Sequence, residues 1–124
     1  MKKLVLLVTI LITGLTVFSQ GIDFQKGRYA EVLEMAKKQN KLVFIDIYTS
    51  WCGPCKMMMK NIFPLKEVGN YLNSKFVCIK IDAEKGEGPE LAKRYQVKAY
   101  PTFVAINPAE EILMTKVGGS GSGS

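Results

Sequence analysis

Two cysteines separated by two residues, Cys52 and Cys55, are the side chains of this chain best suited to chemistry. Sulfur atoms at this spacing can form and break a disulfide by thiol–disulfide exchange. Gly53 removes side-chain bulk beside the first sulfur, and Pro54 suits the first turn of a helix, where its missing N–H costs nothing. The spacing therefore predicts a redox-active dithiol rather than a structural staple, because so short a loop gains little from being closed.

The segments on either side of the cysteines predict where the pair lies. An apolar run over residues 42–48 precedes them, and a segment typical of a helix follows from Lys56. Cys52 then lies at or just before a helix N-terminus, where the dipole and free N–H groups favour a thiolate. We expect Cys52 to be the nucleophile and Cys55, one turn inside the helix, to be the more shielded sulfur.

Composition excludes several classes of function. The chain has 124 residues, 48% hydrophobic and 23% charged, which indicates one globular domain. The formal net charge is +6, but the basic residues form no cluster with interleaved aromatics, so we expect no nucleic-acid binding. The chain contains no histidine, which excludes Cys–His and Ser–His–Asp catalysis.

A metal site is also not expected. Zinc and iron–sulfur sites need about four ligands. The chain has three cysteines, and Cys78 lies on a separate predicted strand, apart from Cys52 and Cys55. We interpret Cys78 as a small buried hydrophobic residue.

The N-terminus resembles a secretory signal peptide over residues 1–19. Lys2 and Lys3 precede an apolar segment, and Val17-Phe18-Ser19 fits a cleavage site. An uncleaved membrane anchor is the alternative, although the apolar run is shorter than the ~20 residues of a span. We therefore expect a periplasmic or otherwise secreted domain over residues 20–118, followed by a Gly/Ser linker or cloning tail over 119–124.

The spacing of the apolar residues and the turn-forming residues between segments predict an α/β fold, with a central mixed β-sheet flanked by helices. A short segment at Ile22–Phe24 is expected to be an edge strand or a lead-in. The expected helices cover residues 28–39, 52–62, 67–74 and 89–95, and the expected strands cover 42–48, 76–82, 103–106 and 111–117.

The sequence Trp51-Cys52-Gly53-Pro54-Cys55-Lys56 after an apolar strand resembles the active site of the thioredoxin superfamily. Asp46, six residues before Cys52, matches the buried acid of that family, and Tyr100-Pro101-Thr102 matches its cis-proline loop. The resemblance covers about residues 22–118 and implies a thioredoxin fold.

The resemblance also implies roles for these residues. Cys52 attacks a disulfide, Cys55 resolves the intermediate, and Asp46 accepts a proton from Cys55. Trp51, Gly53, Pro54, Tyr100 and Pro101 line the substrate groove.

The implied function is reduction of protein disulfides by a cycle of the Cys52–Cys55 pair. A thiol oxidase or isomerase using the same pair, and a non-catalytic binding module with this fold, remain as alternatives. The sequence carries no site for NADPH or flavin, so no cofactor is expected. The expected partners are protein thiols and disulfides and an upstream membrane thiol-electron donor, and we expect a monomer.

Two departures from the family pattern affect these expectations. Alignment places Cys78 where thioredoxins keep a lysine beside the buried acid, so the tuning of Asp46 is expected to differ. The C-terminal helix of the family is missing from the sequence. The sheet face at Phe103–Ile106 is therefore expected to be exposed or covered by something else.

Overall fold

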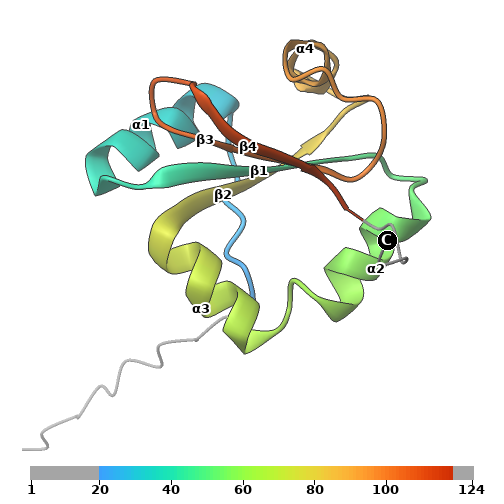
Figure 1. The fold of residues 1–124 in the computed structure, drawn as a ribbon, viewed down its shortest axis with the longest axis horizontal. Coiled ribbons are helices and arrows are strands. Elements are labelled where there is room, and N and C mark those ends of the chain that lie inside the picture. The colour runs from blue at the N-terminus through green and yellow to red at the C-terminus, as the bar shows by residue number, and fades with distance from the viewer. Residues whose placement is uncertain (1–19, 119–124) are drawn as a thin grey trace, which may run out of the picture.

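A computed structural model describes residues 20–118, and Figure 1 shows a single sheet with helices on both faces. Helices α1 and α4 lie on one side of the sheet, and α2 and α3 lie on the other. The elements in chain order are α1 (Tyr29–Gln39), β1 (Leu42–Tyr48), α2 (Gly53–Asn61), α3 (Lys66–Lys75), β2 (Phe76–Asp82), α4 (Gly88–Arg94), β3 (Thr102–Ile106) and β4 (Ile112–Val117).

The four strands form a mixed sheet in the order β2-β1-β3-β4. β1 pairs in parallel with β2 and antiparallel with β3, and β3 and β4 form an antiparallel hairpin. The predicted α/β class with a mixed sheet is therefore confirmed. The segment before α1 adds one parallel bridge, Phe24 to Cys78, so it is a lead-in rather than a full strand.

Local sequence accounts for the end of α1. Asn40 takes the left-handed conformation (φ 54°), and its N–H bonds to the carbonyls of Ala36 and Lys37. Asparagine tolerates this conformation better than most residues, so it ends the helix and turns the chain into β1. Lys37 and Lys38 lie in the last turn, where their positive charges interact favourably with the negative end of the helix dipole.

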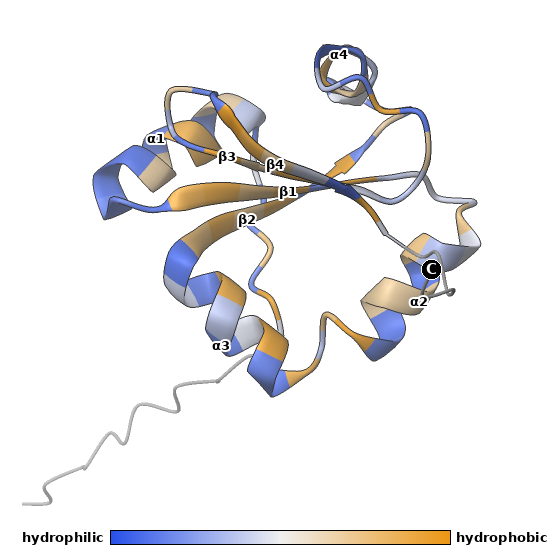
Figure 2. Cartoon of the chain, in the orientation of Figure 1, coloured by the Kyte–Doolittle hydropathy of each residue, from blue (hydrophilic) through white to orange (hydrophobic). Residues whose placement is uncertain are grey.

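The sheet separates two apolar cores. Alternate residues of β1 point to opposite faces, so Val43, Ile45 and Ile47 pack under α1 and α4, whereas Phe44 packs toward α2 and α3. Figure 2 shows the resulting pattern, with largely apolar strands between helices that carry both polar and apolar residues. Because Asp46 alternates with Ile45 and Ile47, it belongs to the face that α2 and α3 cover.

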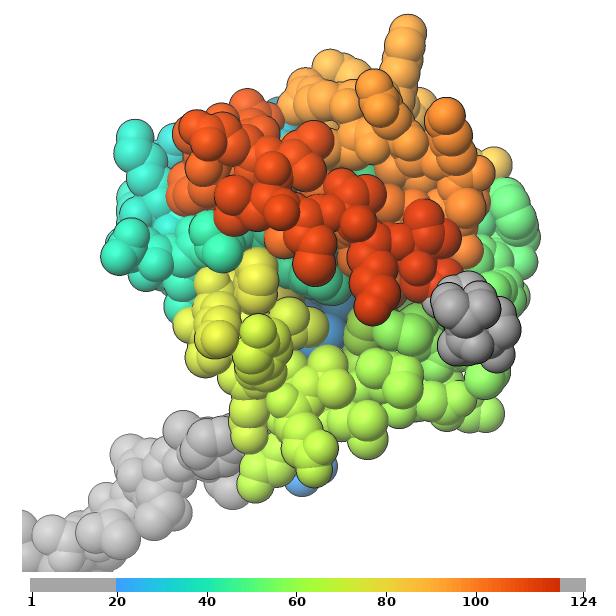
Figure 3. Space-filling view, viewed as in Figure 1, coloured from blue at the N-terminus to red at the C-terminus, as the bar shows by residue number. Residues whose placement is uncertain are grey.

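The uncovered part of the sheet is β4 rather than β3. All five residues of β3 are buried. Val104 and Ile106 belong to the core under α1 and α4, whereas Phe103 stacks on Phe44 and meets the edge of Phe63 on the α2/α3 face. All six residues of β4 are exposed, including Ile112 and Met114. Figure 3 shows this strand across the front of the molecule. Of the two outcomes expected for Phe103–Ile106, coverage by other side chains is the one observed.

The predicted signal peptide over residues 1–19 and the predicted tail over 119–124 lie outside the described residues. Within residues 20–118, no helix has the length and apolar character needed to cross a membrane.

Candidate active site

Cys52 and Cys55 form a disulfide at the start of α2, with their Cα atoms 5.3 Å apart. Both residues are only 4% exposed. The expectation that Cys55 is the more shielded of the two is therefore wrong for this oxidised state.

Cys52 is the N-cap of α2, as its position in the sequence predicted. Its Sγ accepts the backbone N–H of Cys55 at 3.2 Å, and its carbonyl accepts the N–H of Lys56 at 3.2 Å. After reduction, the same N–H and the positive end of the helix dipole would stabilise a Cys52 thiolate. The geometry thus supports Cys52 as the nucleophile.

Gly53 and Pro54 form the exposed first turn of α2 above the dithiol. A Cβ atom built at Gly53 would meet no other atom within 4 Å. The space beside Gly53 is therefore open to solvent, so a side chain there would clash with no part of this fold. A glycine at this position matters only for a molecule that approaches the dithiol from solvent. The place of Gly53 and Pro54 at a substrate groove stays a prediction.

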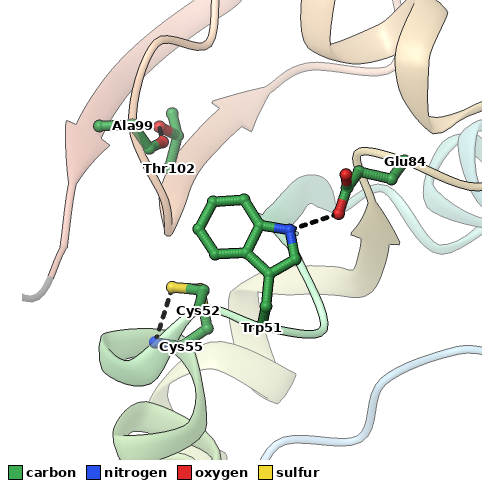
Figure 4. Close-up of a disulfide and its surroundings, with 6 residues drawn as sticks. All are labelled: Trp51, Cys52, Cys55, Glu84, Ala99 and Thr102. Carbon is green, nitrogen blue, oxygen red and sulfur yellow. Dashed lines mark hydrogen bonds between the residues drawn. A yellow bond between two sulfur atoms is a disulfide. The ribbon is translucent and has the colours of Figure 1, made fainter.

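The loop before β3 carries the predicted cis peptide, between Tyr100 and Pro101. Pro101 is buried, and the Thr102 hydroxyl donates to the Ala99 carbonyl at 2.6 Å, which closes the loop around that peptide (Figure 4). The Tyr100 ring meets the Trp51 indole edge to face, with centroids 5.9 Å apart. Since Trp51 directly precedes Cys52, this contact places the loop at the dithiol.

Trp51 is 64% exposed, yet it is held at two points. Its ring packs on Tyr100, and its indole N–H donates to Glu84 Oε1 at 2.6 Å. Figure 4 shows the indole between the Glu84 carboxylate and the cysteine pair. Trp51 and Tyr100 therefore lie together, with Pro101 next to Tyr100 in the chain, and their role in a substrate groove stays a prediction.

Asp46 is a buried carboxylic acid on β1, the strand that leads to the dithiol. It is 2% exposed, and its Oδ1 has no hydrogen-bond partner within the described part of the chain. Burial raises the pKa of Asp46 from 3.8 to about 7, an effect that the positive charge of Lys80 opposes. A carboxyl group with this pKa can take up or release a proton near neutral pH.

The cross-strand neighbour of Asp46 is Lys80, not Cys78. The parallel register pairs Asp46 with Lys80 and Cys78 with Phe44, so the alignment that placed Cys78 beside the acid is wrong. Burial lowers the pKa of Lys80, and the negative charge of Asp46 acts in the opposite direction. The acid therefore keeps a lysine neighbour, supplied by a residue two positions further along β2.

Cys78 itself is a free thiol that is 1% exposed. Burial raises its pKa to about 12, so it stays protonated at neutral pH. This agrees with its interpretation as a small buried hydrophobic residue. Among residues 20–118, no group of three or more His, Cys, Asp or Glu side chains is arranged to hold a metal ion.

A pocket of about 360 Å³ lies between α2 and the edge of the sheet. Its lining includes Cys55, Thr49 and Lys80, the last of which is the neighbour of Asp46. The Thr49 hydroxyl is buried without a hydrogen-bond partner among the described residues. The pocket is large enough for water, so a water molecule can reach the Cys55 side of the dithiol.

Two residues of the site, Lys80 and Glu84, were not found from the sequence. Lys80 depends on strand register, and Glu84 reaches Trp51 from 33 residues away. Thr102 was recognised as part of the loop, but its bond to Ala99 was not predicted. The polar loop after β2, which carries Glu84, gave no signal in the sequence of a contact with Trp51.

The sequence and the fold of this chain are similar to those of known proteins. The family model Thioredox_DsbH, described as "Protein of unknown function, DUF255", matches residues 18–107. Thioredoxin-like protein slr0233 of Synechocystis is 34% identical over 87 residues, covering 70% of this chain and 78% of that protein. A solution structure from Bacteroides thetaiotaomicron, provisionally named a disulphide-isomerase, is 44% identical with a TM-score of 0.73, covering 82% of this chain and 84% of that one.

Other curated relatives are much longer than the matched region. Thioredoxin Y of rice chloroplasts is 37% identical over 83 residues, which are 67% of this chain and 46% of the relative. The chain thus spans about half the length of that protein. The match to the family model, the fold and the capped Cys52–Cys55 pair agree, and the chain belongs to the thioredoxin superfamily, within the Thioredox_DsbH family.

Proposed function

We propose that this protein reduces disulfide bonds in other proteins through a cycle of its Cys52–Cys55 pair. The observation that carries the proposal is the N-cap position of Cys52, whose sulfur accepts the Cys55 N–H at 3.2 Å. A cysteine held in this way is stabilised as a thiolate, which is the form that attacks disulfides.

The cycle has two exchange steps. In the first, the Cys52 thiolate forms a bond to one sulfur of the substrate disulfide, and the other substrate sulfur leaves as a thiolate that takes a proton from water. In the second, Cys55 loses its proton and attacks Cys52. The Cys52–Cys55 disulfide forms, the mixed disulfide breaks, and the second substrate thiol is released.

Asp46 is the proposed proton acceptor for Cys55 in the second step. Its pKa of about 7 suits proton transfer near neutral pH. The pocket beside Cys55, Thr49 and Lys80 offers a place for a water molecule that carries the proton between the two groups. Trp51, Tyr100 and Pro101 would hold the substrate chain beside Cys52.

The reducing direction is proposed from the residues between the cysteines. The Gly53–Pro54 dipeptide is that of thioredoxins, which lie near the reducing end of the family at about −270 mV. The Bacteroides relative is provisionally named a disulphide-isomerase, so isomerisation by the Cys52–Cys55 pair is a second candidate. The potential of the pair decides between them.

We further propose that the domain works outside the cytoplasm as a monomer. The N-terminal segment has the features of a signal peptide, with Lys2 and Lys3 before an apolar run. A reductase in an oxidising compartment must be recharged, so an upstream membrane thiol-electron donor is the expected partner.

Reduction of insulin in the presence of dithiothreitol tests the activity. The protein should accelerate the reduction, and Cys52→Ser should abolish the acceleration. A rate equal to that of dithiothreitol alone would favour a non-catalytic binding module. The matched control is Cys78→Ser, which removes a thiol that plays no part in the proposed cycle.

A further inference from the structure

We propose that Glu84 is a positioning residue, which fixes the Trp51 indole as one wall of the substrate groove. This inference rests on the proposed action on protein disulfides. It goes further by naming a residue outside the cysteine motif that prepares the docking surface. Glu84 does not touch the sulfur atoms; it acts through Trp51.

An exposed tryptophan is normally free to change rotamer, because few atoms pack against it. Trp51 is 64% exposed, yet its ring packs against the Tyr100 ring and its N–H donates to Glu84 Oε1. The bond to Glu84, at 2.6 Å, joins an N–H to a carboxylate, which is a strong class of hydrogen bond. The indole is therefore held in one orientation beside Cys52.

The acceptor is itself fixed by its loop. The Glu84 N–H donates to Asp82 Oδ1 at 2.9 Å, and the Ala83 N–H donates to the Tyr48 carbonyl at 2.8 Å. Gly88 packs so tightly on the Asp82 carbonyl that a Cβ atom there would overlap it. The loop after β2 is thus tied to both parallel strands, and it presents Glu84 at a set place.

A preset indole lowers the cost of binding, because the substrate does not have to order that side chain. Loss of the bond should therefore weaken substrate binding while leaving the sulfur chemistry intact. For Glu84→Ala we expect KM for a disulfide-bonded protein such as insulin to rise about three- to tenfold, with kcat within about twofold of wild type. Glu84→Gln retains an oxygen that can accept the indole N–H, and it should keep most of the wild-type KM.

Trp51 is the one tryptophan of the chain, so its fluorescence reports on this contact directly. In Glu84→Ala, acrylamide should quench Trp51 more strongly and its anisotropy should fall, whereas Glu84→Gln should resemble wild type. Glu111→Ala is the matched control, since it removes an exposed acidic side chain far along the sequence, on the approach to β4. It should change neither the fluorescence nor KM.

The proposal is overturned if Glu84→Ala leaves the quenching and anisotropy of Trp51 unchanged. It is also overturned if Glu84→Gln raises KM as much as Glu84→Ala does, because charge rather than positioning would then be responsible. If wild type reduces no protein disulfide, the proposed function fails, but the fluorescence comparison still decides whether Glu84 fixes Trp51.

Discussion

Asp46 and Lys80 lie directly opposite each other on the parallel strands β1 and β2, on the face of the sheet that α2 covers. The acid is almost completely buried, and Lys80 also lines the pocket that reaches Cys55. Lys80 therefore lies next to Asp46 in the sheet and lines the same pocket as Cys55, the second cysteine of the pair. Burial raises the pKa of Asp46 and the positive charge of Lys80 opposes that rise, so the two effects together set the pH at which Asp46 loses its proton.

The first prediction concerns stability in Asp46→Asn. The pKa of Asp46 is raised on folding, from 3.8 to about 7, so Asp46 keeps its proton to a higher pH in the folded state than in the unfolded state. Below pH 3.8 the contribution of Asp46 to the wild-type free energy of unfolding is fully present, and it is lost as the pH rises to about 7. The advantage of Asp46→Asn should therefore grow by about 1.4 kcal/mol per pH unit across that window and level off above it.

Urea unfolding of the oxidised proteins at intervals of pH measures this difference. Because the disulfide is intact in both proteins, the redox state of the cysteines does not contribute. A difference in unfolding free energy that stays constant from pH 4 to pH 8 would show that Asp46 titrates normally, and it would remove the acid from the proposed mechanism.

The second prediction concerns Lys80→Met. The positive charge of Lys80 holds the pKa of Asp46 down, so its removal should raise that pKa further above the ordinary value. NMR titration of the Asp46 carboxyl carbon measures the shift. Lys66→Met, which removes an exposed charge from the start of α3, is the control. If the Asp46 midpoint does not move in Lys80→Met, the lysine does not tune the acid.

Much of this fold can be predicted from the sequence. The strands β1 (Leu42–Tyr48) and β2 (Phe76–Asp82) begin and end as expected, because both are apolar runs rich in β-branched residues with polar residues on either side. Cys52 caps its helix as expected, because the Gly-Pro pair that follows suits a first turn and little else.

What could not be predicted depends on contacts between distant segments. The pairing of Asp46 with Lys80 follows from the register of two strands, which spacing along the chain does not specify. The burial of Phe103 on β3 depends on its stacking against Phe44, and the orientation of Trp51 depends on Glu84. Each of these contacts joins residues more than 30 positions apart.

The third prediction concerns the reactivity of Cys78. Its thiol is buried and its pKa is raised to about 12, so almost no thiolate is present at neutral pH. The oxidised native protein should show no reactive thiol toward a chromogenic disulfide reagent within minutes, and one thiol should appear in denaturant. Rapid labelling of Cys78 in the native protein would mean that its strand opens readily.

The reduction potential of the Cys52–Cys55 pair, measured by equilibration with glutathione, tests the central proposal most directly. A capped thiolate separated from its partner by Gly-Pro should give a value near about −270 mV, the thioredoxin end of the range. A value near about −120 mV would contradict a reductase and favour a thiol oxidase, and a pair that never equilibrates with glutathione would contradict redox function altogether.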